Sequence, residues 1–404
     1  MKYIVLVGDG MADRPLKDLD GKTPLEVARI PNMDFVAKEG TVGCASTIPE
    51  SLSPASDVAN MALLGYDPVI YYTGRGPLEA ANMGIELSKN EIAFRCNLVT
   101  VAEEKMADYS AGHISNKEAA TLIKFIDKKL GSNTIRFYPG VSYRHLAVVN
   151  HNKLHLKKDD LIKTLCTPPH DILNRNISRY MPNGAASGFL TDLMLKSKDI
   201  LSGHDINKVR LDLNENPGNM VWLWGQGTKP EMPSFYDKFK LHGSIISAVD
   251  LIKGIGKIIG LDVMDVPGAT GYYDTDYLAK AKYALESLKK KNFVFVHVEA
   301  PDEAGHNGDI RAKITAIENF DRLVVGTILG SLRKGNKDFK LMVLPDHATP
   351  ISVRTHTRDP IPFAMYGNGI EKDGISSFNE PSIRTSNIYL DKGHKILEMF
   401  IKGH

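Results

Sequence analysis

The chain has 404 residues, enough for two domains with substantial cores. Its formal charge of +2 argues against nucleic acid or an anionic membrane as the main partner. The 3 cysteines are far apart and form neither a metal spacing nor a disulfide framework, which suits a reducing cytosol. No apolar run approaches the ~20 residues of a membrane span, and residues 3–7 are too few for a signal peptide. We therefore expect a cytoplasmic protein.

The first predicted strand, residues 3–7, ends at Gly8-Asp9-Gly10. The two glycines let the backbone turn sharply and leave the Asp9 carboxylate uncrowded. Asp9 could simply form an Asx turn or cap the next helix. However, the carboxyl end of a strand is also where α/β folds keep their functional residues.

A helix start is predicted at Ser53-Pro54, with Ser53 as N-cap and Pro54 as the first helical residue. Ser56 then falls in the first turn, where free backbone N–H groups favour negative charge. A serine there can act as a nucleophile whose phosphorylated form is stabilised by the helix. The alternative is that Ser56 only helps to cap the helix.

The pattern of predicted elements changes between residues 77 and 239, where short strand-like runs such as 146–149 alternate with many turns. We therefore predict a discontinuous catalytic domain, residues 1–76 and 240–404, and an inserted domain, residues 77–239. Loops of the inserted domain offer Arg, His and Asn side chains suited to phosphate and carboxylate groups. Most of these side chains could equally be ordinary surface residues.

After residue 240 strands and helices alternate again. Strands are predicted at 244–249, 261–266 and 293–298, and a helix at 276–290. The strand at 293–298 leads to Asp302 and His306, which are four apart and fall on one side of a helical turn. His297, inside the strand, is expected in the core or supporting a neighbouring ligand.

The last part of the chain contains a predicted amphipathic helix at 310–329 and a buried strand at 339–344. Asp346-His347 follows that strand directly, and His356 returns in a polar loop. A further strand at 361–366 and a short helix at 395–400 complete the chain. The bland alternative is that Asp346 caps a turn and that the histidines are solvated.

Carboxylates and imidazoles thus follow several predicted parallel strands, and the carboxyl ends of such strands open on one edge of the sheet. Their number exceeds the needs of one zinc ion and suits two metal ions sharing a site. Because no thiolate is present, Mn²⁺ or Zn²⁺ is expected, and Mg²⁺ or Co²⁺ is compatible. The six residues are Asp9, Asp302, His306, Asp346, His347 and His356.

Several segments in fixed order resemble the archaeal-type cofactor-independent phosphoglycerate mutases of the alkaline phosphatase superfamily. They are residues 8–10, 53–60, 73–80, 222–227, 297–306, 346–347 and 355–357. The resemblance covers nearly the whole chain. It implies an α/β fold, with an alkaline-phosphatase-like, mostly parallel sheet flanked by helices and a smaller inserted α+β domain.

The resemblance also implies roles for residues. One metal ion would be held by Asp302, His306 and His356, and the other by Asp9, Ser56, Asp346 and His347. Ser56 would accept the phosphoryl group of 3-phosphoglycerate as a phosphoserine and return it to the 2-hydroxyl, a reaction of glycolysis and gluconeogenesis. His113 resembles the acid/base histidine, and the inserted domain would exclude water as a lid. The predicted substrate contacts are Arg144, Arg210, Asp108 and His145.

The chain has no Arg-His-Gly motif, which disfavours the mutase class that depends on bisphosphoglycerate. A phosphatase or phosphonate hydrolase of the same superfamily would use the same metals and Ser56, but it would release inorganic phosphate. A phosphopentomutase would act on sugar phosphates. A non-catalytic metal- or phosphate-binding module would leave Ser56 buried away from the metals.

Overall fold

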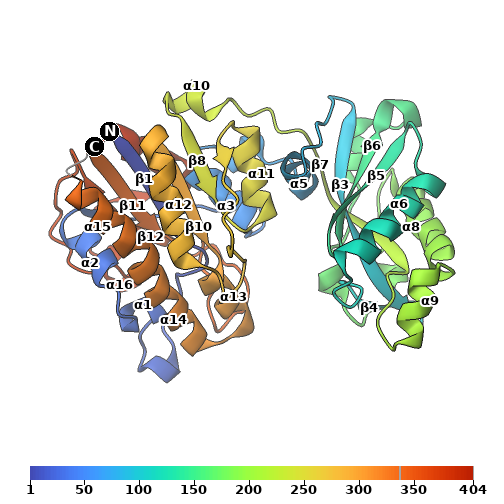
Figure 1. Cartoon of the computed structure of the whole chain (residues 1–404), viewed down its shortest axis with the longest axis horizontal. Coiled ribbons are helices and arrows are strands. Elements are labelled where there is room, and N and C mark those ends of the chain that lie inside the picture. The colour runs from blue at the N-terminus through green and yellow to red at the C-terminus, as the bar shows by residue number, and fades with distance from the viewer. Residues whose placement is uncertain (336–337, 404) are drawn as a thin grey trace. The chain divides into compact units, whose positions relative to one another are not determined.

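The computed structural model describes residues 1–335 and 338–403, and the chain divides into two compact units. Unit 1 comprises Met1–Tyr72 with Glu231–His404, and unit 2 is Thr73–Pro230. Unit 2 is therefore inserted into unit 1 along the chain (Figure 1). The boundaries expected at 76/77 and 239/240 lie further along the chain than these limits, and the lid role of the inserted segment stays a prediction.

Unit 1 is built on an eight-stranded sheet with the order β13-β2-β12-β11-β1-β10-β8-β9. Most neighbouring strands are parallel; β12 runs antiparallel to both β11 and β2. The sheet confirms the predicted α/β class. Its strands are β1 (Lys2–Gly8), β2 (Thr41–Ala45), β8 (Gly243–Ile246), β9 (Asp262–Val263), β10 (Phe293–Val298), β11 (Phe339–Leu344), β12 (Ile361–Gly367) and β13 (Tyr389–Leu390).

The three central strands β10, β1 and β11 carry the positions of greatest interest. Each is a nearly continuous apolar run, because both faces of a parallel sheet are covered. The register pairs Val7 with His297 on one side and with Leu344 on the other. The three strands therefore end level with one another, and the residues that follow them emerge at the same edge of the sheet.

Helices cover both faces of this sheet, and α12, α14 and α15 lie in front of it in Figure 1. These helices and α2 enclose an apolar core with one face of the sheet, including Ile4, Leu6 and Val296. The helices of unit 1 are α1 (Pro24–Val27), α2 (Pro31–Lys38), α3 (Ser56–Leu63), α4 (Pro68–Tyr71), α10 (Phe235–Phe239), α11 (Asp250–Ile258), α12 (Tyr277–Lys290), α13 (Ala300–Asn307), α14 (Ile310–Asn319), α15 (Gly326–Lys334), α16 (Glu380–Ile383) and α17 (Ile396–Lys402).

The helix predicted at 310–329 is interrupted by a π-helical segment, η5 (Phe320–Val325), between α14 and α15. Within this segment the buried Asp321 carboxylate accepts hydrogen bonds from the backbone N–H groups of Asn32 (3.3 Å) and Met33 (2.7 Å). These N–H groups belong to the first turn of α2, where backbone N–H groups have no hydrogen-bond acceptor within the helix. Asp321 thus anchors the start of α2.

Unit 2 has an antiparallel sheet with the order β4-β3-β6-β5, and β7 pairs with β3. Helices α6 and α8 pack on it around Phe94, Leu98 and Trp222. This α+β arrangement agrees with the predicted class of the insertion. Its strands are β3 (Glu91–Ala102), β4 (Lys105–Asp108), β5 (Ile135–Val141), β6 (Arg144–Asn150) and β7 (Met220–Thr228), and its helices are α5 (Arg75–Asn82), α6 (Asn116–Leu130), α7 (Lys158–Lys163), α8 (Ser187–Ser202) and α9 (Asp205–Asp212).

Two local predictions need correction. The strand predicted at 261–266 is reduced to β9, Asp262–Val263. Residues 222–227 read in the sequence as a strand that runs into a tight turn, but the whole segment lies within β7, which continues to Thr228. Gly225 has φ = 60°, and the register shifts between Ala93 and Arg95 on the partner strand, so the glycine accommodates an irregularity in the pairing.

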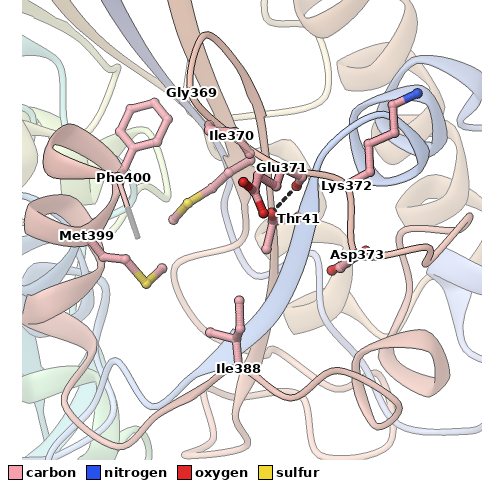
Figure 2. A pocket seen from close by; sticks show the side chains of 11 residues that line it. Thr41, Gly369, Ile370, Glu371, Lys372, Asp373, Ile388, Met399 and Phe400 are labelled. Atoms are coloured by element: carbon pink, nitrogen blue, oxygen red, sulfur yellow. Dashed lines mark hydrogen bonds between the residues drawn. The ribbon is translucent and has the colours of Figure 1, made fainter.

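A cavity of about 390 Å³ opens at the edge of the unit 1 sheet where β2 begins and β12 ends (Figure 2). Its walls are largely apolar, with Met365, Met399 and Phe400 among them. The Thr41 hydroxyl donates a hydrogen bond to the Glu371 carbonyl oxygen. None of the described residues that line it is a histidine, so the clustered imidazoles lie elsewhere. No helix within residues 1–335 and 338–403 is long and apolar enough to span a membrane.

Candidate functional site

The carboxyl edge of the unit 1 sheet gathers the predicted metal-binding side chains. Asp9 follows β1, and Asp346 and His347 follow β11. Asp302 and His306 lie on α13, directly after β10, and His356 lies in the loop beyond β11. The three carboxylates are buried, with 1%, 5% and 0% exposure for Asp9, Asp302 and Asp346. Their side chains, far apart in sequence, therefore share one water-poor region.

One group of side chains surrounds Asp9 and Asp346. His347 Nε2 lies 3.3 Å from Asp9 Oδ1 and 3.5 Å from Asp346 Oδ2. The orientation of Asp346 is fixed because its carboxylate accepts hydrogen bonds from Asn60 Nδ2 (2.7 Å) and from the backbone N–H of Gly10 (3.1 Å). The fourth predicted member, Ser56, joins this group through His347.

A second group surrounds Asp302. His306 Nε2 is 3.2 Å from Asp302 Oδ2, and His356 Nε2 is 3.4 Å from Asp302 Oδ1. The two Nε2 atoms are only 2.9 Å apart, so both rings point at one position. Ligand atoms of Asp302, His347 and His356 also lie within 4.8 Å of one another, which makes His347 a neighbour of both groups.

Ser56 is the first residue of α3, and its hydroxyl lies 3.0 Å from His347 Nε2. The predicted helix start is wrong by two positions, since Ala55 is the N-cap and Ser53 and Pro54 precede the helix. Extended backbone at Ala55 (φ −164°, ψ 147°) ends the loop there. As a result Ser56 projects from the N-terminus of the helix, where unpaired N–H groups favour an anion.

The charges in this region perturb one another strongly. Burial raises the pKa of Asp9 well above its ordinary value, and the neighbouring charges of Asp346 and Asp302 add to the effect. Burial also acts to raise the pKa of Asp302, but hydrogen bonds from His306 and His356 outweigh it and hold that pKa well below normal. Three carboxylates crowded in low dielectric repel one another, so the arrangement favours a bound cation.

His297 on β10 was expected in the core or in support of a ligand, and it is fully buried. Its Nε2 lies 3.2 Å from Asp9 Oδ2 and 3.8 Å from Asp346 Oδ2. Ligand atoms of these three residues lie within 4.8 Å of one another, so geometry alone also allows His297 to coordinate. Within the described part of the chain, Asp9 Oδ1 and His297 Nε2 are buried without a hydrogen bond. Buried polar atoms without a hydrogen-bond partner are expected at residues that bind a metal ion.

In unit 2, Asp108 and His113 belong to one loop. The Asp108 carboxylate accepts hydrogen bonds from the backbone N–H groups of Ser110 and Gly112, both at 2.7 Å, and from Asn216 Nδ2 at 2.9 Å. Burial acts to raise the pKa of Asp108, but these hydrogen bonds prevail and lower it. Asp108 therefore shapes the loop that presents the exposed His113, rather than offering free acceptors to a substrate.

Two of the predicted substrate contacts are occupied with internal bonds. Arg210 is 4% exposed and donates to Ala111 O, Asn216 O and the Glu118 carboxylate. His145 is 1% exposed, and its Nδ1 accepts a hydrogen bond from the Gly140 N–H at 3.0 Å. Burial lowers the pKa of His145 to about 3, so its ring stays neutral. Both side chains are buried within unit 2 and do not offer a free surface to a ligand.

Arg144 is exposed and lies 5.7 Å from the Tyr143 ring, so it remains accessible. The structure adds two arginines that the sequence reasoning missed. Arg95 lies over the Trp224 ring at 4.4 Å, and Arg75 lies over the same ring at 5.7 Å. Burial lowers the pKa of Arg95, and the charges of Arg75 and Arg144 lower it further. We call Arg75, Arg95, Arg144 and Trp224 the arginine cluster.

A signal for the arginine cluster was present in the sequence. Arg95 is a charged residue inside the apolar run of β3, where burial without a partner would be costly. It pairs with Glu79 on α5, with 2.9 Å between Nε and Oε1. His170, whose ring lies 5.2 Å from Trp224, extends the same surface. Guanidinium groups that lie together over an aromatic ring are suited to binding phosphate or carboxylate.

Comparison with known proteins places this chain in a family. The family model for 2,3-bisphosphoglycerate-independent phosphoglycerate mutase matches residues 37–207. Mutases of that name from Methanosarcina barkeri (48% identity) and M. acetivorans (49%) align over 100% of both chains. The chain belongs to the 2,3-bisphosphoglycerate-independent phosphoglycerate mutase family. A probable mutase from Geobacter sulfurreducens is 46% identical over 99% of this chain and 100% of its own.

Solved structures agree with this membership. A cofactor-independent phosphoglycerate mutase from Thermoplasma acidophilum has a TM-score of 0.66 at 27% identity and covers 100% of this chain and 99% of its own. A Pyrococcus horikoshii protein reaches a TM-score of 0.82 at 30% identity, covering 99% of this chain and 96% of its own. The phosphoglycerate mutase family thus accounts for the whole chain, both units included.

Proposed function

We propose that this protein interconverts 3-phosphoglycerate and 2-phosphoglycerate, without bisphosphoglycerate, through a phosphoserine on Ser56. The single observation that carries the proposal is the position of Ser56. Its hydroxyl stands at the N-terminus of α3 and 3.0 Å from His347 Nε2, beside the buried carboxylates. A nucleophile at that point lies beside the carboxylates and imidazoles that could hold a metal ion against a transferring phosphoryl group.

Two divalent ions fit the donor set. Asp302, His306 and His356 would hold one ion, and the group Asp9, Ser56, Asp346 and His347 would hold the other. The facing Nε2 atoms of His306 and His356 and the orphaned Asp9 Oδ1 support this assignment. Carboxylate and imidazole donors without thiolate favour Mn²⁺ or Zn²⁺, with Mg²⁺ or Co²⁺ compatible. When bound, such ions lower the pKa of a coordinated hydroxyl and neutralise phosphoryl oxygens.

Burial and hydrogen bonds determine the protonation state and the orientation of the His347 ring. Burial lowers the pKa of His347 to about 4, so the ring is neutral near pH 7. The Thr349 hydroxyl donates to Asp302, which leaves its oxygen to accept a hydrogen bond from His347 Nδ1 at 3.2 Å. This assigns the proton to Nδ1 and turns the Nε2 lone pair toward Ser56. Ser56 then attacks the phosphate, and the released glycerate takes the phosphoryl group back on its 2-hydroxyl.

Unit 2 supplies the remaining roles in this proposal. The exposed His113 on the loop shaped by Asp108 protonates the leaving alkoxide and deprotonates the attacking hydroxyl. The arginine cluster binds the carboxylate of the substrate, because guanidinium groups match planar anions with paired hydrogen bonds. Retention of glycerate between the two half-reactions requires that water be excluded, and we assign the lid role to unit 2.

The test is conversion of 3-phosphoglycerate to 2-phosphoglycerate by the full chain with added Mn²⁺ and without bisphosphoglycerate. Wild type is compared with Ser56→Ala and with Ser53→Ala, a matched loss of a hydroxyl three residues earlier on an exposed position. We expect conversion by wild type and Ser53→Ala, none by Ser56→Ala, and loss of wild-type activity on chelation. Inorganic phosphate as the main product, without 2-phosphoglycerate, would identify a hydrolase and overturn the proposal.

A further inference from the structure

Lys313 on α14 is an amine with no contact with water and no assigned role. Its side chain and that of Asp13 both have 0% exposure, and Nζ lies 2.7 Å from Asp13 Oδ2. The amine also donates to the carbonyl oxygens of Thr349 (2.8 Å) and Ala12 (3.3 Å). All three protons of the ammonium group are thus used inside the protein.

The acceptors belong to two loops that carry predicted metal-binding residues. Ala12 and Asp13 lie in the loop after β1, which begins with Asp9, and Thr349 lies in the loop after β11, which contains Asp346. The Asp13 carboxylate also links the two loops, because it accepts a hydrogen bond from the Ile351 N–H at 3.2 Å. The Lys313–Asp13 pair therefore ties the two loops to each other and to α14.

Thr349 transmits this restraint to the predicted ligands. Its carbonyl faces Lys313, while its hydroxyl donates to Asp302 and lies 3.2 Å from His347 Nδ1. Gly10 fits closely against the same atoms. A Cβ at Gly10 would lie 2.5 Å from Asp302 Oδ1 and 2.6 Å from Thr349 Oγ1. A shift of Thr349 would therefore move one member of each ligand group.

We propose that the Lys313–Asp13 pair positions the two metal-binding groups relative to each other, a role that rests on the proposed two-metal function. Both side chains are fully buried and neither residue is a predicted ligand, so both act through Thr349 and the loop after β1. A buried ion pair is a poor source of stability, because apolar residues of similar volume are often as stabilising. The contribution of the pair is geometric, because three hydrogen bonds from one ammonium group fix the loops after β1 and β11 relative to each other.

The unit contains a matched control for a buried lysine. Lys340 on β11 is 5% exposed, and its Nζ donates to the carbonyl oxygens of Phe400 (3.3 Å) and Ile401 (3.2 Å) in α17. It lies near the start of β11, at the sheet edge opposite the metal-binding residues. Lys340→Met removes an equal charge and two hydrogen bonds to carbonyl oxygens without touching either loop.

The first experiment measures amide hydrogen exchange in the metal-free full chain. Lys313→Met should speed exchange at Thr349 and Ile351 by at least about tenfold, while the strands β1 and β10 keep their protection. Because Lys313→Met leaves Asp13 buried without its partner, the double variant Lys313→Met/Asp13→Asn is made in parallel. It removes both charges and should fold even if the single variant does not. Lys340→Met should leave both loops protected.

The second experiment titrates the full chain with Mn²⁺ and follows free and spin-coupled ions by electron paramagnetic resonance. We expect two ions in wild type and Lys340→Met, and an affinity about 10–100-fold lower in the Lys313 variants, with loss of the coupled signal. Unchanged exchange and unchanged Mn²⁺ binding in the double variant would overturn the proposal. Failure of wild type to bind two ions would instead refute the proposed metal centre, and the exchange experiment would still decide whether the pair orders the loops.

Discussion

The carboxyl edge of the unit 1 sheet and the arginine cluster of unit 2 concentrate charges of opposite sign. The first brings three buried carboxylates together with four imidazoles, and the second stacks guanidinium groups over an indole ring. A concentration of negative groups favours cations, and a concentration of guanidinium groups favours anions. A phosphoryl-transfer enzyme needs both, and this chain assigns each to a separate unit.

The two regions also differ in how the backbone holds the charged groups. The carboxylates of unit 1 follow parallel strands that end level, so the fold itself determines their spacing. The arginines of unit 2 come from β3, the start of α5 and the start of β6, and their placement depends on packing against Trp224 and Tyr143. We therefore expect substitutions among the carboxylates of unit 1 to abolish chemistry and substitutions in the arginine cluster to weaken binding.

The largest effect is expected from Asp302→Asn. Asp302 lies within 3.4 Å of both His306 and His356, so loss of its charge removes a shared ligand. Turnover should fall by about 10³-fold or more, and one Mn²⁺ should be lost from the titration. Glu303→Gln is the matched control, because it neutralises the next residue of α13. Equal losses in both variants would mean that net negative charge, and not ligand geometry, supports activity.

A second prediction separates binding from stability in unit 2. Arg144 is exposed, so Arg144→Met should raise KM about tenfold and leave unfolding unchanged. Arg210→Met removes a buried guanidinium that pairs with the partly exposed Glu118 and should destabilise unit 2 by about 2 kcal/mol with little change in KM. Both tryptophans, Trp222 and Trp224, lie in unit 2, so indole fluorescence during urea unfolding reports this unit. The reverse pattern would restore Arg210 as a substrate contact.

The same contrast explains what could be predicted from sequence. The strands at 293–298 and 339–344 were predicted to the residue, because continuous apolar runs are unambiguous. Residues directly after such strands could be placed at one edge without any tertiary information. The start of α3 was misplaced because Ser53-Pro54 is a strong local signal that the loop overrides.

The roles of unit 2 residues depend on contacts that local sequence does not reveal. Arg210 and Arg144 look equally suited to an anion, yet one is enclosed by Ala111, Asn216 and Glu118 and the other is exposed. Burial is decided by distant segments, so a loop arginine cannot be assigned from its neighbours in sequence. Arg95 was open to prediction, because a lone charge in an apolar strand requires a nearby partner.

The smallest expected effect concerns His145, which tests whether it is a structural residue. Burial lowers its pKa to about 3, against about 6.5 in an unfolded chain. The unfolded state therefore binds a proton more readily, and the stability of unit 2 is complete above pH 6.5 and falls as the pH drops toward 3. The slope approaches about 1.4 kcal/mol per pH unit for one proton.

His145→Asn keeps an acceptor near the Gly140 N–H but cannot titrate. The smaller side chain should cost about 1 kcal/mol at pH 7.5, whereas at pH 4 the variant should be the more stable protein. Urea unfolding followed by indole fluorescence at both pH values gives the comparison, with the exposed His155→Asn as control. Parallel stability curves for wild type and His145→Asn would show that the ring is not held neutral by burial. The residue would then be open to the ligand-binding role that its burial and its hydrogen bond with the Gly140 N–H argue against.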